Sequence, residues 1–145
     1  SHSGRLRMRT VATLLAIAMC LGVAGCEERE QKIVASRLSP DGRHVLWVTN
    51  EYGGLGSGVV RVHITGKDQV PEPRTVVLRT PECSGAIVGW VDSVTVAVVY
   101  ESLSANSFFS GVPGDELHTV LVDRRSRSGI DVQPTDGIAL PCDPY

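Results

Sequence analysis

The stretch IVASRLSPDGRHVLWVTN, residues 33–50, predicts two β-strands joined by a tight turn. Pro40 fixes the backbone φ angle, and Asp41-Gly42 accepts the positive φ of a short hairpin turn. After the turn, residues 43–50 alternate in a two-residue period with apolar side chains on both faces. A strand that is apolar on both faces is buried on both, so we expect residues 43–50 to be a central strand.

The rest of the chain extends this pattern, because valine and threonine alternate with polar residues and no long window has a helical period. The branched side chain of valine suits a half-buried sheet surface. The glycine-rich residues 53–58 are followed by a strand pattern and not by a helix, so a hairpin loop fits them better than a phosphate-binding loop. We predict an all-β domain over residues 33–145, an antiparallel meander of about seven short strands that forms a sandwich or an open barrel. The expected strands cover residues 33–38, 43–50, 59–65, 74–80, 86–91, 94–101 and 117–123, with a weaker one at 130–132.

Two motifs carry a resemblance to known proteins. The turn Ser39-Pro40-Asp41-Gly42-Arg43 resembles a turn that recurs in blades of TolB-like and WD40-like β-propellers. A propeller needs at least four blades and about 120 residues hold two or three, so this resemblance is local. With the Gly-Gly loop and the Ile87–Val96 hairpin, the turn is similar to small uncharacterised bacterial envelope proteins, many of them lipoproteins. That resemblance covers residues 38–100 and implies no catalytic residues.

The N-terminus has the pattern of a secretory signal peptide. Basic residues at positions 5, 7 and 9 precede an apolar run over residues 11–23. The run is too short for a membrane-spanning helix, which needs roughly 20 apolar residues. Val23-Ala24-Gly25-Cys26 resembles a lipobox, which implies cleavage after residue 25 and lipidation of Cys26. An ordinary signal peptide with a chance cysteine is the alternative.

These features divide the chain into three parts. We expect a signal-peptide helix over residues 1–25, a lipidated cysteine with a disordered polar tether over 26–32, and the β domain after it. Met8 is the expected native start, with residues 1–7 upstream or non-native sequence. The expected location is the bacterial cell envelope, on the exported side of a membrane.

Charge narrows the possible partners. Residues 26–145 carry 14 − 3 = 11 basic and 16 acidic residues, a net charge of −5. Nucleic acid and anionic lipid surfaces both require a basic protein surface, so we expect neither as a partner. Arg124, Arg125 and Arg127 form the one basic cluster, which we interpret as a solvated loop. Membrane attachment is expected through the lipid alone.

Cysteine and histidine usage argue against a metal or another cofactor. Cys20 is lost with the signal peptide and Cys26 carries lipid, which leaves Cys83 and Cys142 to form a disulfide in an oxidising compartment. Two free thiols are the alternative. No C-x-x-C spacing supports zinc, and His44, His63 and His118 stand singly.

Three function classes remain: a binding module, an envelope hydrolase, and an accessory subunit of a larger assembly. No Gly-x-Ser-x-Gly elbow or metal motif is present, so we expect a non-catalytic binding or accessory module, with an envelope hydrolase as the alternative. Phe108-Phe109, in a polar stretch, is a candidate contact site for an envelope protein or a glycan, or else a cap on the sheet. We expect Trp47 and Trp90 in the core.

Overall fold

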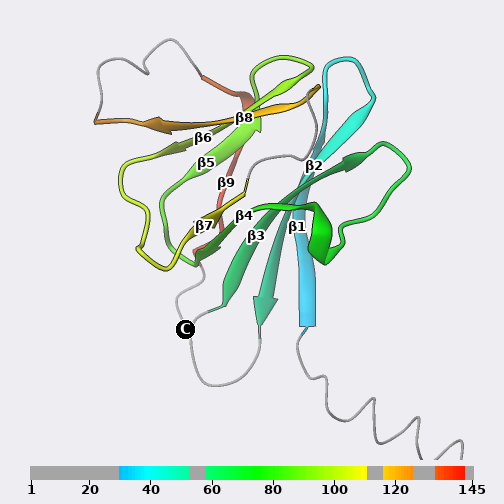
Figure 1. Cartoon of the computed structure of the whole chain (residues 1–145). Helices are drawn as coiled ribbons and strands as arrows, with labels where there is room; N and C mark the ends of the chain where they lie inside the picture. The colour runs from blue at the N-terminus through cyan, green and yellow to red at the C-terminus, as the bar shows by residue number, and fades with distance from the viewer. Residues whose placement is uncertain (1–29, 53–57, 111–115, 126–132, 143–145) are drawn as a thin grey trace, which may run out of the picture.

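The structure is a computed structural model that describes residues 30–52, 58–110, 116–125 and 133–142. The described residues form nine strands in two sheets and one short 3₁₀ turn, with no α-helix (Figure 1). The sheets do not close into a barrel, so the predicted all-β class is confirmed as a sandwich. The predicted signal peptide, Cys26 and the weak strand predicted at residues 130–132 lie outside the described residues. The strands are β1 (Glu30–Leu38), β2 (His44–Tyr52), β3 (Val59–Gly66), β4 (Val76–Pro81), β5 (Ile87–Trp90), β6 (Thr95–Tyr100), β7 (Phe108–Phe109), β8 (His118–Asp123) and β9 (Thr135–Ala139).

The first sheet has the order β1-β2-β3-β4-β7 and is antiparallel throughout. The turn between β1 and β2 forms as its sequence predicts, with Gly42 at a φ of 75°. The Asp41 carboxylate accepts hydrogen bonds from the Ser39 hydroxyl at 2.7 Å and from the backbone N–H of Arg43 at 3.1 Å. These bonds fix the register of the hairpin, and β2 lies between β1 and β3 as expected for a central strand.

The second sheet has the order β8-β6-β5-β9 and differs from the predicted meander. β5 and β6 form the expected hairpin, but β8 pairs with β6 in parallel. A parallel neighbour requires a long crossover connection, and residues 101–117 between β6 and β8 provide it. The expectation of a purely antiparallel fold is therefore wrong for this one pair.

Four local expectations are also corrected. β1 begins at Glu30, so the last three residues of the predicted tether belong to the sheet. Residues 74 and 75, expected at the start of a strand, belong instead to the 3₁₀ turn η1 (Pro73–Thr75), since a proline there lacks a backbone donor. β7 and β9 are strands that the sequence did not predict.

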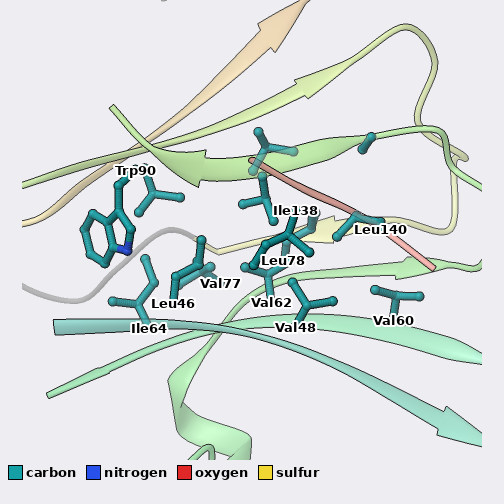
Figure 2. Packing of buried hydrophobic residues seen from close by; sticks show 14 residues of the cluster. Leu46, Val48, Val60, Val62, Ile64, Val77, Leu78, Trp90, Ile138 and Leu140 are labelled. Carbon is teal, nitrogen blue, oxygen red and sulfur yellow. The ribbon is translucent and has the colours of Figure 1, made fainter. Parts of the chain in front are cut away.

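The core fills the space between the sheets. Side chains of β2, β3 and β4 point toward those of β5 and β9 (Figure 2). Leu46, Val62 and Val88 are fully buried there. Trp90 is in this core as predicted, and its indole N–H donates to the carbonyl of Arg37 at 3.0 Å, which fixes β1 against the second sheet. Within the described residues, no helix is long and apolar enough to cross a membrane.

Candidate functional site: a pocket at one end of the sandwich

Cys83 and Cys142 are joined in a disulfide, with their Cα atoms 4.2 Å apart. The bridge lies just beyond β4 and β9 and connects the two sheets at one end. Next to it, the backbone N–H of Cys83 donates to the carbonyl of Pro141 at 3.0 Å. Ile138 and Leu140 are buried in the core immediately before the bridge. The disulfide therefore holds the last strand, which has few apolar residues of its own.

Phe108 and Phe109 do not form a joint exposed surface. Both belong to β7 and pair with Arg79 and Leu78 of β4. Phe108 is 62% exposed, whereas Phe109 packs against the core. Only Phe108 is available for contact with another molecule. Trp47, expected in the core, instead lies half-buried on the outer face of the first sheet, where its indole N–H donates to the Thr65 hydroxyl at 2.9 Å.

A pocket of about 510 Å³ opens between the start of β2, the end of β3, residues 66–75, the start of β4 and the residue before β8. We call residues 66–75 the 66–75 segment. Ile64 and Val77 are buried and, with the half-buried Leu117, give the pocket an apolar floor. Val70 and Arg74, at its rim, are exposed, so the pocket is open to solvent. In the sequence, residues 66–73 lie between two predicted strands and residues 74–75 begin the second of them, and no pattern there predicts a pocket.

A chain of hydrogen bonds runs behind the pocket, across the outer face of the first sheet. The Gln31 amide N–H donates to the Thr49 hydroxyl at 3.0 Å, and that hydroxyl lies 3.3 Å from Nε2 of His63. On the other side of the ring, Nδ1 of His63 lies 2.9 Å from the Thr75 hydroxyl and 3.1 Å from the Glu72 carbonyl oxygen. A carbonyl oxygen only accepts, so Nδ1 carries the proton and Nε2 accepts one from Thr49.

Burial sets the electrostatic state of this ring. His63 is 1% exposed, and desolvation lowers its pKa below the ordinary value of 6.5. The hydrogen bond to the Glu72 carbonyl opposes that effect, and the charge of Arg61 reinforces it. The imidazole is therefore neutral at pH 7. It connects β1, β2 and β3 to the 66–75 segment and so fixes one wall of the pocket.

The pocket and the start of β1 lie at opposite ends of the first sheet. Glu30 pairs with Tyr52, and Glu51 pairs with Val59, at the end that also holds the disulfide. His44 pairs with Gly66 at the other end, where the pocket is. A nine-residue strand spans roughly 25–30 Å, which separates the two ends.

The described residues contain no group of three histidine, cysteine, aspartate or glutamate side chains that could hold a metal ion. His44 lines the pocket, whereas His63 lies behind it with threonine, glutamine and carbonyl partners. Arg124 and Arg125 are exposed, and Arg127 lies outside the described residues. The available sequence signal for the polar chain was the pair Thr49 and His63, two polar residues within strands, because their burial requires partners for their polar atoms.

Comparison with known proteins found no match: no family model, curated protein or solved structure matches the chain.

Proposed function

We propose that this protein is a lipid-anchored, non-catalytic binding module of the bacterial cell envelope. The basic flank, the apolar run and the Val23–Cys26 box support the anchor. β1 begins at Glu30, four positions after Cys26, so the anchor attaches to the sandwich by a very short connection. The domain on that anchor carries a pocket with an apolar floor and mostly polar residues around it, the common composition of ligand sites.

The main support for the proposal is the distance between the two ends of the first sheet, one with Glu30 and the other with the pocket. A lipid on Cys26 lies at the Glu30 end, and the pocket lies beside His44 and Gly66 at the other end. The module then holds its pocket roughly 25–30 Å away from the bilayer surface. A pocket in that position binds a soluble molecule of the envelope and not a membrane lipid.

The non-catalytic part of the proposal rests on the hydrogen bonds of His63, the ring that lies behind the pocket. The His63 ring has its described partners in Thr49, Thr75, Gln31 and the Glu72 carbonyl, with no serine or carboxylate among them. A general base needs a free ring nitrogen within hydrogen-bond reach of its substrate. His63 has neither ring nitrogen free, so its role in the proposal is to hold the 66–75 segment in place.

The anchor is tested by expressing the full chain in a bacterium and labelling cells with an alkyne-bearing palmitate. We expect labelled protein in the membrane fraction, and mass spectrometry of the mature N-terminus should give an acylated Cys26. A Cys26→Ser variant should lose both the label and stable membrane association, because several acyl chains hold far more tightly than none. Cys20→Ser is the matched control and should keep both.

An unmodified N-terminus downstream of Cys26, or an uncleaved chain, would overturn the proposal. Label that persists in the Cys26→Ser variant would also contradict it, since the acyl group would then be attached elsewhere.

A further inference from the structure

Most polar groups that line the pocket are already engaged within the protein. The Thr65 hydroxyl donates to the Gly66 carbonyl at 2.8 Å, and the Gln69 side-chain oxygen accepts from the Gly66 backbone N–H at 3.0 Å. Glu72 is paired with Arg74 at 2.7 Å. Groups that are already bonded within the protein contribute little to the recognition of a ligand.

Two polar groups of the lining remain without a partner among the described residues. The exposed carboxylate of Asp68 has no hydrogen bond or ion pair there. Nδ1 of His44 is inaccessible to solvent and has no hydrogen-bond partner there. Because that nitrogen has no accessible surface, Asp68 is the unpartnered group that a molecule in the pocket can reach.

The charge balance of the pocket favours a cation. Asp68 and Glu72 contribute two negative charges, and Arg74, which is paired with Glu72, contributes one positive charge. The lining therefore has a surplus negative charge at Asp68. The same lining includes the apolar floor of Ile64, Val77 and Leu117, which matches an aliphatic stem.

We infer that this pocket binds a primary ammonium group carried on an aliphatic stem. The ammonium pairs with the Asp68 carboxylate, and the stem covers the apolar floor. Two kinds of molecule carry such a group: a free alkylamine, and an envelope protein through the side chain of a lysine. The inference rests on the pocket of the proposed function but not on the lipid anchor.

The test uses the ¹⁵N-labelled full chain in detergent micelles, with titrations followed through its amide resonances. The probes are hexylamine, hexan-1-ol and hexanoate, which share a six-carbon stem. We expect saturable shifts in the 66–75 segment and at Leu117 with hexylamine, and weaker or no shifts with the other two. A tripeptide with a central lysine, compared with its Nε-acetylated form, distinguishes a protein-borne amine from a free one.

Asp68→Asn should weaken hexylamine binding about fivefold, the loss expected for one exposed ion pair. Glu101→Gln is the matched control, because it removes the same charge from an exposed carboxylate at the far end of β6 and should leave the affinity unchanged. Equal shifts with all three probes, no shift with either amine, or an unchanged affinity in Asp68→Asn would overturn the inference. Each of these outcomes leaves the acylation of Cys26 untouched, so the two proposals fail separately.

Discussion

The two sheets of the sandwich are built in different ways. In the five-stranded sheet, β1 to β4 are neighbours in space in the order of the chain, and each step is antiparallel. In the four-stranded sheet, only β5 and β6 are joined as a hairpin, while β8 and β9 come from distant parts of the chain. Its edge strand β9 has a single buried residue, Ile138.

The difference indicates where the stability of each sheet originates. Local turns and alternating apolar residues account for β1 to β4 of the five-stranded sheet, and only the two-residue β7 joins it from a distant part of the chain. The four-stranded sheet depends on long-range restraints, which are the disulfide, the close approach of Pro134 to Gly89 and the core position of Ile138. Loss of such a restraint should loosen one sheet before the other, as expected for cooperative units of unequal stability.

The largest expected effect follows from removal of the disulfide. The bridge closes a loop with a sequence separation of 59 residues, and its loss should lower the free energy of unfolding by about 4 kcal/mol on the chain-entropy model. The Cys83→Ser/Cys142→Ser double variant tests this through its denaturant midpoint. Hydrogen exchange should show β9 amides losing protection while β2 amides keep most of theirs. If β2 and β9 lost protection together, the sheets would not be separate units.

A smaller effect is expected from Gly89→Ala in β5. A Cβ at this position would lie 2.7 Å from Cβ of Pro134 and 3.2 Å from Cα of Gly137, and neither of these atoms belongs to a flexible side-chain end. The clash should push β9 away and lower the free energy of unfolding by about 2 kcal/mol. Thermal or urea unfolding of the variant and the wild-type chain measures this decrease.

Gly66→Ala in the five-stranded sheet is the matched control. Its Cβ would meet only the end of the Gln69 side chain, at 3.2 Å, which can move. We expect a change within about 0.5 kcal/mol, because no backbone or core atom has to move. A cost equal to that of Gly89→Ala would contradict the proposed difference between the sheets.

The hairpins of the two sheets could be predicted from the sequence, whereas β8 and β9 could not be placed, and the reasons are physical. The hairpin at residues 39–42 and the β5–β6 hairpin have turn residues and alternation that act locally. β9 was missed because residues 135–139 include one core residue, and they form a strand by pairing with β5. No local sequence signal predicts that β8 pairs in parallel with β6, because the pairing depends on the path of the 17 residues that connect the two strands. The pocket was missed because its walls come from segments distant in the chain.

The smallest expected effect concerns pH and the five-stranded sheet. The pKa of His63 is lower in the folded protein than its ordinary value of 6.5, so the unfolded chain binds a proton more readily. The free energy of unfolding should therefore be fully maintained above pH 6.5 and decrease as the pH falls below it. Asp41, Asp92 and Asp123 also have lowered pKa values, but from an ordinary value of 3.8, so they act at lower pH.

Urea unfolding between about pH 7 and pH 5 measures this dependence, in a window above the titration of most carboxyl groups. The His63→Gln variant keeps an amide that can both donate and accept, and it should have a flatter profile than the wild-type chain. If the free energy of unfolding changed equally with pH in the two proteins, groups other than His63 would be the cause of the pH dependence. Exchange at low pH should appear first in the 66–75 segment, because the His63 ring holds that segment to β3.

The position of Glu30 at one end of β1 has a mechanical consequence. A pulling force applied between Glu30 and the 66–75 segment acts along the axes of β1, β2 and β3. The ladder hydrogen bonds of antiparallel strands lie perpendicular to that direction. The force is therefore shared by the whole set of bonds in shear, and they do not open one after another from an end. The five-stranded sheet is a strong element along this axis, whereas a force that peels β9 from the edge of the other sheet breaks its few bonds in turn.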